Sequence, residues 1–417
     1  MHSQNIPSFG DIRAAAKQLP GAVVRTPLVA STKLSDLTGA NIFVKHENMQ
    51  ATNSFKDRGA LIKLASLDAE EKARGVVAMS AGNHAQAVAY RAREMGIAAT
   101  IVMPLDTPFT KISRTEALGA EIELYGETLA ESEVAARRLM SERNLTLIHP
   151  YDDPAVMAGQ GTIGLELFED HPKLDAVVVP VGGAGLITGI AIALKELHPD
   201  IDIIGVEVAS FASMTAHLAG REPHFGGQTL ADGIAVKKVA SGAIKAAPEL
   251  ISKVLVVSEA EIEQAICHYL TEHKTLAEGA AAAALAAVLQ KPEMFAGRDV
   301  ALICTGGNID PRILSSILYR QLEREDRIVS LRVHIDDRPG VLGLVSSVLG
   351  KAGANILEVY HGRMFLDMPA RSAALDLLIE TKDTAHAARV IDDMRAQGFV
   401  VKRLAAPAGG DLSSDEG

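Results

Sequence analysis

Cysteine and aromatic residues are scarce in this chain. Only Cys267 and Cys304 occur among its 417 residues, and tryptophan is absent. Two cysteines can build neither a disulfide framework nor a cysteine-based zinc site, and such low usage is typical of a reducing compartment. We therefore expect a cytoplasmic protein without a metal centre. Because aromatic residues make up only 4% of the chain, the core must be mainly aliphatic.

The chain also lacks a surplus of positive charge and a long apolar run. Its formal net charge is −11, which argues against nucleic acid or an anionic membrane as the main partner. The longest apolar stretch, residues 280–289, is mostly alanine and too short to cross a bilayer. The first residues do not show the basic and then apolar pattern of a signal peptide.

Most of the chain alternates short β-branched runs with alanine-rich helical patterns. This alternation predicts parallel sheets with helices on both faces and ligands at the loops that follow the strands. A chain of 417 residues with 48% hydrophobic content is expected to form two or three domains. The predicted strands cover residues 41–45, 75–79, 100–103, 121–124, 176–180, 202–207 and 300–304.

The pattern changes near residue 325. Residues 321–327 are predicted to form a charged linker, and the spacing in residues 328–404 predicts a small ferredoxin-like α+β domain of βαββαβ order. Residues 405–417 consist largely of glycine, serine, proline and acidic residues. We expect them to form a disordered tail.

The segment Asn53-Ser54-Phe55-Lys56-Asp57-Arg58-Gly59 places one lysine at the expected start of a helix. Ser54 can cap this helix, and apolar residues follow at helical spacing. The helix dipole and partial burial would lower the pKa of Lys56, and such a lysine suits Schiff-base chemistry on a carbonyl cofactor. Taken alone, the segment is better explained by a lysine on a solvated helix face.

Ser80-Ala81-Gly82-Asn83-His84 follows a predicted strand and opens an alanine-rich helix. Backbone N–H groups at such a helix start can hold an anion such as an amino-acid carboxylate, and Asn83 adds a side-chain donor. The alternative is an ordinary strand-to-helix turn. By itself, His84 is better explained as a structural residue than as a catalytic one.

Two further glycine-containing loops follow predicted strands. Gly182-Gly183-Ala184-Gly185-Leu186 has neither the trailing lysine of a nucleoside-triphosphate loop nor the spacing of a dinucleotide fingerprint, so it suits a single phosphate group. Thr305-Gly306-Gly307-Asn308 offers a hydroxyl and a backbone that a ligand can approach closely. Each loop on its own could be no more than a tight turn.

These four motifs occur in one order, and over residues 5–320 the chain resembles the fold-type II enzymes that use pyridoxal 5′-phosphate (PLP), in particular the threonine dehydratases. The resemblance implies a catalytic domain over residues 1–320, built of two open, twisted, parallel-rich α/β sheets. A small subdomain at roughly residues 50–150 would be inserted in the large one. Supporting matches are His149-Pro150, Ala158-Gly159-Gln160-Gly161-Thr162 and Ala231-Asp232-Gly233.

The resemblance also implies a role for each motif. Lys56, next to Phe55, would bond PLP covalently and, once freed, take the Cα proton of the substrate. Thr305 would contact the pyridine nitrogen. Because a hydroxyl does not keep that nitrogen protonated, the ring is a weaker electron sink, and elimination of a β-hydroxyl is favoured over transamination. The other implied contacts are the PLP phosphate with Gly182, Gly183, Ala184, Gly185 and Leu186, the cofactor's 3′-oxygen with Asn83, and the substrate carboxylate with Ser80, Ala81, Gly82, Asn83 and His84.

The chain departs from the family pattern at several positions. Ala184 stands where the phosphate loop usually has glycine, and we expect this position to have backbone angles that L-residues tolerate, since a left-handed angle would cost about 1 kcal/mol or more. In the metal-stimulated serine racemase branch, an acidic group stands six residues after the position of Glu207. Ser213 occupies that place here, so a tight divalent site is not expected. That branch also has serine at the position of Ala81, so racemisation should be poor.

The resulting expectation is a lyase that converts L-threonine to 2-oxobutanoate and ammonia, with L-serine as a poorer substrate. Glu278 and Gly233 are possible additional site residues, although Glu278 could equally be a polar helix start. One alternative is an ammonia-lyase directed at serine or 3-hydroxyaspartate. An alternative of another class is an amino-acid sensor without activity, against which the presence of Lys56, Asn83 and Thr305 argues.

Residues 328–404 resemble an ACT domain, a small module that binds amino acids and regulates enzymes. The resemblance implies allosteric control by isoleucine or valine, and, because ACT modules usually pair between subunits, a homodimer or homotetramer. The alternative is a purely structural or dimerising domain. The residues that carry the match, and thus the expected effector site, are Arg338, Pro339, Gly340, Val341, Leu342, Asn355 and Ile356.

Overall fold

The computed structural model describes residues 5–362 and 372–404. The chain divides into two compact units, Met1–Ile309 and Asp310–Gly417. The first unit contains two parallel-rich sheets and the second a small antiparallel sheet, which confirms the expected fold class.

The larger sheet of the first unit has six strands in the order β1-β2-β10-β7-β8-β9. All neighbours are parallel except β1, which pairs antiparallel with β2. Every residue of β7 is buried, as expected for a parallel strand covered on both faces. The strands are β1 (Leu28–Ala30), β2 (Asn41–Lys45), β7 (Ala176–Pro180), β8 (Asp202–Val208), β9 (Lys253–Val257) and β10 (Asp299–Ile303).

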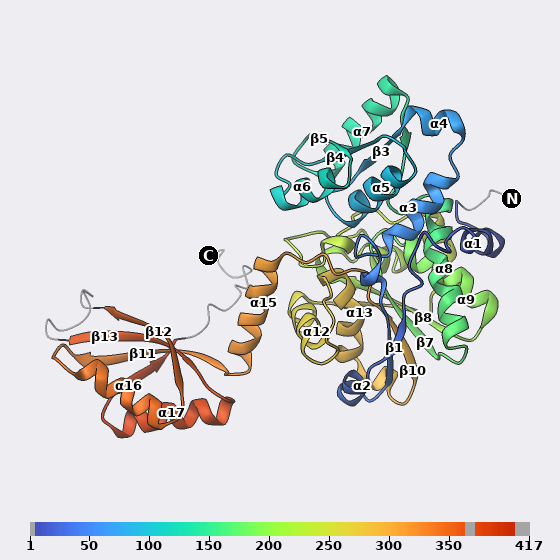
Figure 1. Cartoon of the computed structure of the whole chain (residues 1–417). Coiled ribbons are helices and arrows are strands. Elements are labelled where there is room, and N and C mark those ends of the chain that lie inside the picture. Colours follow the sequence, from blue (N-terminus) through green and yellow to red (C-terminus); the bar gives the residue numbers. More distant parts are fainter. Residues whose placement is uncertain (1–4, 363–371, 405–417) are drawn as a thin grey trace. The chain divides into compact units, whose positions relative to one another are not determined.

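Helices cover both faces of this sheet, with α8 and α9 on one side and α12 and α13 on the other (Figure 1). The alanine run forms α13, and its small side chains are buried against β7, β8, β9 and β10. No helix in the described part of the chain is long and apolar enough to cross a membrane. The helices of this part are α1 (Phe9–Ala16), α2 (Thr32–Thr38), η1 (Glu47–Met49), α8 (Pro154–Asp170), α9 (Gly185–Leu197), η2 (Ala209–Phe211), α10 (Ser213–Leu218), η3 (Asp232–Ile234), α11 (Ser241–Leu250), α12 (Glu259–Thr271), α13 (Gly279–Gln290) and α14 (Pro292–Phe295).

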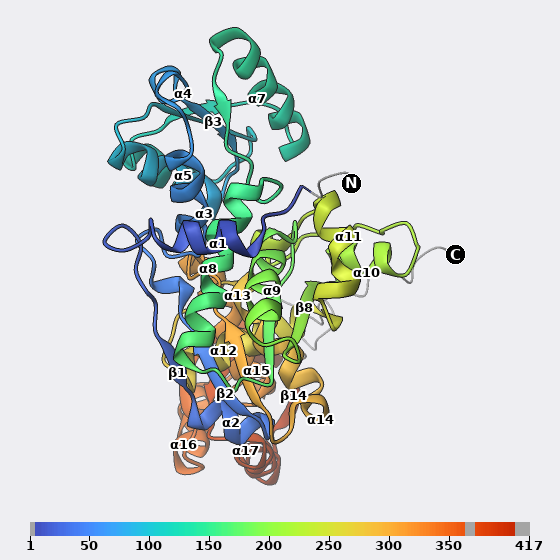
Figure 2. The same cartoon turned by 90° about the vertical axis from the view of Figure 1, so that its right-hand side faces the viewer.

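The smaller sheet of the first unit has four parallel strands in the order β5-β4-β3-β6. This sheet and its helices form the upper part of the unit in Figures 1 and 2. The strands are β3 (Val76–Met79), β4 (Ala99–Met103), β5 (Glu121–Leu124) and β6 (Thr146–Leu147). The helices are α3 (Lys56–Ala65), α4 (Ala69–Arg74), α5 (Asn83–Glu94), α6 (Phe109–Ala117) and α7 (Leu129–Arg143).

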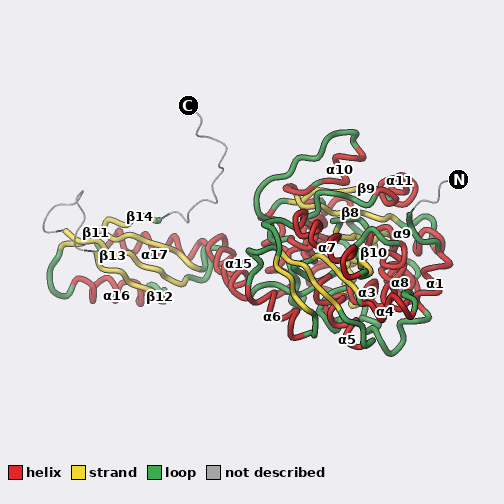
Figure 3. Tube along the Cα trace, turned by 90° about the horizontal axis from the view of Figure 1, so that it is seen from above, coloured by secondary structure: helices red, strands yellow, loops and turns green. Residues whose placement is uncertain are grey.

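The second unit has the predicted βαββαβ order, and its four strands form an antiparallel sheet in the order β12-β13-β11-β14. Apolar side chains of α16 and α17 pack on this sheet in one core, and both helices lie on the same face (Figures 1 and 3). The elements are α15 (Pro311–Arg324), β11 (Ile328–Asp336), α16 (Val341–Lys351), β12 (Asn355–Gly362), β13 (Ser372–Glu380), α17 (Thr384–Ala396) and β14 (Val400–Arg403).

The predicted linker over residues 321–327 is only partly irregular. Residues up to Arg324 belong to α15, which begins at Pro311 after an N-cap by Asp310. The charged residues of this segment are good helix formers, so they extend the helix rather than break it. The predicted disordered tail, residues 405–417, lies outside the described residues.

Candidate active site

The candidate site lies where loops after parallel strands meet the segment that carries Lys56. An isolated bridge joins Ser54 to Gly306. The Phe55 backbone N–H donates to the Thr305 carbonyl oxygen at 3.1 Å, and the Glu278 N–H donates to the Gly306 oxygen at 3.0 Å. Three segments far apart in the sequence are thus joined through their backbones.

Lys56 is the first residue of α3, as the sequence predicts, but the predicted cap is wrong. The N-cap position is Phe55, no side chain caps the helix, and the buried Ser54 hydroxyl has no hydrogen-bond partner among the described residues. Asp57 instead accepts hydrogen bonds from the Thr52 N–H at 3.0 Å and the Thr52 hydroxyl at 2.6 Å. The turn therefore keeps its shape through Asp57, which leaves the Ser54 hydroxyl available.

The Lys56 ammonium donates a hydrogen bond to the carbonyl oxygen of Pro150 at 2.7 Å. Burial lowers the pKa of Lys56 to about 8, although the negative charge of Glu278 opposes this shift. A lysine with this pKa can exist as a free amine near neutral pH, which a covalent bond to a carbonyl group requires.

Glu278 is buried at the start of α13 and joins two other segments, those of Asn83 and Asn308. Its carboxylate accepts hydrogen bonds from the Asn83 side-chain amide at 2.7 Å and from the Asn308 N–H at 3.1 Å. The Asn308 side-chain amide in turn donates to the Asn83 oxygen at 2.8 Å. Burial raises the pKa of Glu278 to about 7, and the nearby Asp232 also raises it. Glu278 can therefore hold or release a proton near neutral pH.

Thr305 and His84 differ in what their polar atoms contact. The Thr305 hydroxyl is buried and has no hydrogen-bond partner within the described residues. An unpartnered buried hydroxyl is costly, so a ligand atom is the natural partner. His84 donates from Nε2 to the Ile148 carbonyl oxygen at 2.8 Å, and burial lowers the pKa of its ring to about 3. A neutral, fixed imidazole of this kind agrees with a structural role.

The glycine-rich loop connects β7 to α9 and packs tightly against its surroundings. A side chain at Gly183 would collide with the Tyr151 ring, and one at Gly185 with the Tyr151 backbone. The expectation for Ala184 is wrong, because this residue has the left-handed angles φ 67° and ψ 3°. The loop leads directly into α9, where the first N–H groups, including that of Leu186, have no intrahelical partner and can hold a phosphate.

Arg58 belongs to the first motif, but its role cannot be predicted from the sequence. Its buried guanidinium donates to Glu47 at 2.8 Å and to Glu166 at 2.6 Å. The pairs fasten α3 to η1 and α8 and thereby fix the position of Lys56. The hydrogen bonds of Asn308 cannot be predicted from the sequence either, although Asn308 belongs to the fourth motif.

These features fit PLP, the cofactor that the resemblance implies. Lys56 offers the amine, the loop at 182–185 offers backbone donors, and the Thr305 hydroxyl is unpartnered. Gly233 lies beside this site, because a side chain there would reach to 3.6 Å from the Glu278 carboxylate.

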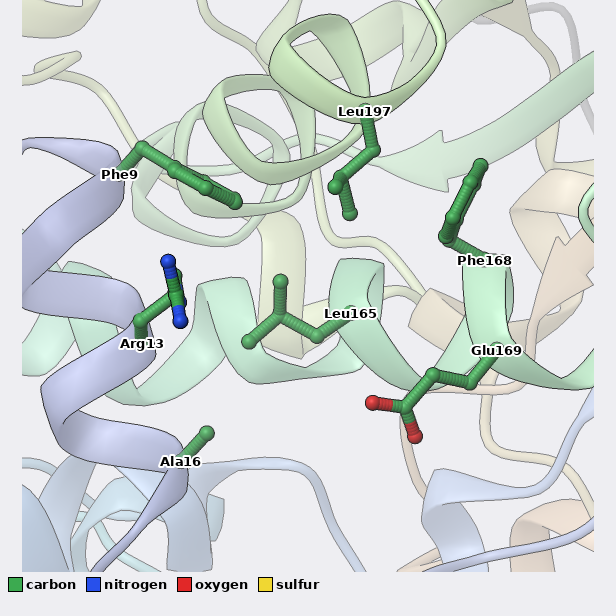
Figure 4. Close-up of a pocket in the computed structure, with 7 residues that line it drawn as sticks. All are labelled: Phe9, Arg13, Ala16, Leu165, Phe168, Glu169 and Leu197. Carbon is green, nitrogen blue, oxygen red and sulfur yellow. The ribbon is translucent and has the colours of Figure 1, made fainter.

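Two other places in the first unit do not contribute to this site. The Glu207 carboxylate accepts hydrogen bonds from the Met214 and Thr215 N–H groups and from the Thr215 hydroxyl. Ser213 donates to the Val236 carbonyl oxygen. Figure 4 shows a separate pocket whose lining includes none of the predicted site residues. It is lined by Phe9, Arg13, Ala16, Leu165, Phe168, Glu169 and Leu197.

The predicted effector residues of the second unit do not lie together within one copy. Asp336, which ends β11, pairs with Ser372, and the loop from Arg338 to Leu342 follows at this end of the sheet. Asn355 pairs with Glu380, which itself pairs with Ile328 at the start of β11. The two halves of the predicted site are therefore at opposite ends of the sheet.

Comparisons with known proteins agree with the geometry of the first unit. The family described as "Pyridoxal-phosphate dependent enzyme" matches residues 19–306. The L-threonine ammonia-lyase of Thermotoga maritima is 43% identical over 394 residues, which are 94% of this chain and 98% of that protein. The L-threonine dehydratase catabolic TdcB of Staphylococcus aureus (strain N315) is 40% identical over 332 residues, 78% of this chain and 96% of that protein.

Solved structures show the same relationship. The processed form of threonine deaminase isoform 2 from Solanum lycopersicum has a TM-score of 0.70 and 35% identity, covering 76% of this chain and 95% of that chain. Family match, relatives and fold thus agree with a site that contains a buried lysine, a glycine-rich loop at a helix start and an unpartnered hydroxyl. The chain therefore belongs to the pyridoxal-phosphate dependent enzymes, as a fold-type II member with PLP as its cofactor.

Proposed function

We propose that this protein is a threonine ammonia-lyase that converts L-threonine to 2-oxobutanoate and ammonia, with L-serine as a secondary substrate. The observation that carries the proposal is the meeting of Lys56, Asn83, Glu278 and Thr305 in one site. The near full-length similarity to the T. maritima L-threonine ammonia-lyase supports threonine as the substrate. The low cysteine content supports a cytoplasmic location.

Lys56 acts as the base in this proposal. PLP, when bound, withdraws electrons from the substrate carbon that bears the amine. With a pKa of about 8, the Lys56 amine can accept the proton from that carbon without being fully protonated beforehand. Arg58 fixes the helix on which Lys56 lies, so the amine needs little reorganisation during the reaction.

The other residues hold ligand groups and favour elimination. The N–H groups from Ser80 to His84, at the start of α5, would hold the substrate carboxylate. The uncharged Thr305 hydroxyl would contact the ring nitrogen of PLP without keeping it protonated, which disfavours transamination. Ala81 offers no proton to the opposite face of the substrate, and this supports elimination over racemisation.

A substrate panel tests the activity. We expect ammonia and 2-oxo acid release from L-threonine with PLP present, and a lower kcat/KM for L-serine. If neither amino acid releases 2-oxo acid, the proposal fails. A higher kcat/KM for serine or 3-hydroxyaspartate would instead favour a lyase directed at that substrate, since a few pocket groups set such preferences.

For the second unit we propose an ACT-type regulatory role with isoleucine or valine as effector. The βαββαβ order and the antiparallel sheet support this assignment. Allostery requires that the effector bind two states of the enzyme differently. Activity of the full chain measured with and without each amino acid tests the role, and an unchanged activity and assembly would refute it for that effector.

Because the predicted effector residues lie at opposite ends of the sheet, a second copy of the chain would be needed to bring both groups together in one site. β12 is an edge strand, and it exposes Leu357, Val359 and Tyr360, the last of them 67% exposed. Exposed apolar edges are pairing sites. If two β12 edges pair antiparallel about a two-fold axis, Asn355 of the second copy comes to the end of the joined sheet where Arg338 lies. The proposal therefore includes a homodimer, or a tetramer built from such pairs.

A further inference from the structure

The two sheets of the first unit are connected at the edge of the site by an ion pair between Asp232, which belongs to one of the sequence motifs, and Lys111, which belongs to none. Lys111 lies in the first turn of α6, on the four-stranded part, and Asp232 lies in η3, on the six-stranded part. The Lys111 ammonium and the Asp232 carboxylate are 2.7 Å apart. Both side chains are partly exposed, at 34% and 60% of their surface, so the pair is at the edge of the site and not in its core.

The element η3 contacts two functional parts of the site. A side chain at Gly182, in the phosphate loop, would lie 3.0 Å from the Ile234 Cα. A side chain at Gly233 would lie 3.6 Å from the Glu278 carboxylate. The backbone next to Asp232 thus lies close to both the glycine-rich loop and Glu278, so a change in the position of Asp232 can affect both.

We propose that Lys111 and Asp232 form a latch that holds the four-stranded part against the six-stranded part, and that their charges act on Glu278. Both are positioning residues, because neither contacts the reacting atoms in this arrangement. The hydrogen bond from Asn83 to Glu278 is a second contact between the same two parts, so the latch and the bond would support each other. The catalytic consequence rests on the proposed function, whereas the latch itself does not.

The charges near Glu278 make this proposal specific. Asp232 raises the pKa of Glu278 and Lys111 lowers it, and Asn83 and Asn308 stabilise its ionised form by hydrogen bonds. The Lys56 ammonium and the buried Cys304 thiol are further titratable groups that interact with Glu278. When one charge of the latch is removed, the other is no longer balanced. The two single variants must therefore shift the pKa of Glu278 in opposite directions.

Two variants and a swapped pair test the latch in the PLP-loaded full-length enzyme. We expect Lys111→Met to move the Glu278-dependent limb of the kcat/KM pH profile to higher pH, and Asp232→Asn to move it to lower pH. Each shift should be about half a pH unit, because the charges are partly screened. The Glu278→Gln variant identifies that limb by removing it. The double variant Lys111→Asp/Asp232→Lys should restore the ion pair. Its Glu278-dependent limb should nevertheless stay at lower pH than in the wild type, because the positive charge then lies nearer to Glu278.

Hydrogen–deuterium exchange provides a readout that does not depend on turnover. Amides of α6, residues 109–117, should exchange several-fold faster in both single variants and at the wild-type rate in the swapped pair. The matched control is Arg143→Met, which breaks an exposed ion pair with Glu121 in the same four-stranded part. It should change neither readout.

Each outcome decides the proposal. Limb shifts of the same sign in both single variants, or unchanged exchange over residues 109–117, would overturn the latch. If the wild-type enzyme releases no 2-oxo acid from any hydroxy amino acid, the proposed function fails, and the exchange data still decide whether the latch exists.

Discussion

The two units of this protein place their functional residues in opposite ways. In the first unit, residues from distant segments meet within one chain and bond to one another, as Asn83, Glu278 and Asn308 do. In the second unit, the two predicted halves of the effector site, around Arg338 and Asn355, are separated by the length of the sheet.

Sheet topology explains the difference. In a parallel sheet all strands end at the same edge, so the loops that follow β7 and β10 gather at one edge of the larger sheet. The loop that follows β3, in the smaller sheet, meets them through the hydrogen bond between Asn308 and Asn83. In the second unit, β11 and β12 are both antiparallel to β13 and so run in the same direction. The residues that follow β11 therefore lie at the opposite end of the sheet from the start of β12. The first unit thus brings its site residues together within one chain, whereas the proposed effector site of the second unit would be completed by a second copy.

The largest expected effect is the loss of activity of the first unit when the proposed base, Lys56, is removed. Lys56→Ala should lower kcat for 2-oxo acid release by about 10³-fold or more, since no amine remains to take the proton. Lys63→Ala, on the same helix, is the matched control and should keep most of the activity. A Lys56→Ala variant with substantial turnover would refute the proposed role of Lys56. Because a sensor without activity shows no turnover, the same result would also exclude that alternative.

The next effect tests whether the second unit needs two copies. Arg338→Ala and Asn355→Ala should each abolish the response of the enzyme to isoleucine or valine while 2-oxo acid release persists. Arg389→Ala, which removes an exposed arginine of α17, is the control and should leave the response intact.

Mixed assemblies make this test sharper. In a one-to-one mixture of the two variants, about one site in four combines an intact loop with an intact Asn355, and part of the response should return. A mixture that responds no better than either variant alone would show that both halves act within a single copy. The contrast between the two units would then be wrong.

A smaller effect concerns the stability of the first unit. Because the pKa of Glu278 is raised to about 7, the folded protein binds more protons than the unfolded chain between the ordinary carboxyl pKa and pH 7. Stability contributed by this group is therefore lost as the pH rises through that window, by about 3 kcal/mol if the full shift is realised. In protein freed of PLP, Glu278→Gln should flatten the dependence of the unfolding free energy on pH between about 4.5 and 7.

Denaturant unfolding at a series of pH values measures this slope. The control is Glu121→Gln, which removes a carboxylate whose ion pair with Arg143 is exposed. An unchanged slope in Glu278→Gln would mean that Glu278 is ionised throughout, and that its environment in the first unit is more polar than its burial indicates.

Much of the fold could be predicted from the sequence. Strands at 41–45, 121–124 and 176–180 begin and end where predicted, because β-branched runs bounded by turn residues define them locally. Three of the four site motifs directly follow predicted strands, which indicates that they lie at strand ends, where ligands bind. The bond between Asn308 and Asn83, 225 residues apart, could not be predicted, because it depends on which side chains face each other after folding.

Errors in prediction arose where tertiary contacts override local preference. Ser54 fits a capping pattern, but Asp57 forms the bonds that hold the turn, and Ser54 is left unpartnered. Ala184 was expected to avoid left-handed angles, yet packing of the loop around Tyr151 imposes φ 67°. Local rules fail most at functional loops, where strain is held by the surrounding structure.

The smallest predicted effect tests that strain. Ala184→Gly should raise the free energy of unfolding of the first unit by about 0.5–1 kcal/mol, because glycine adopts the left-handed angle freely and the gain exceeds its extra chain entropy when unfolded. Ala191→Gly, the same change in the right-handed part of α9, should lower it by about 1 kcal/mol. If both substitutions destabilise to a similar extent, the left-handed angle at Ala184 is unstrained, and the parallel unit would form its phosphate loop without storing energy in it.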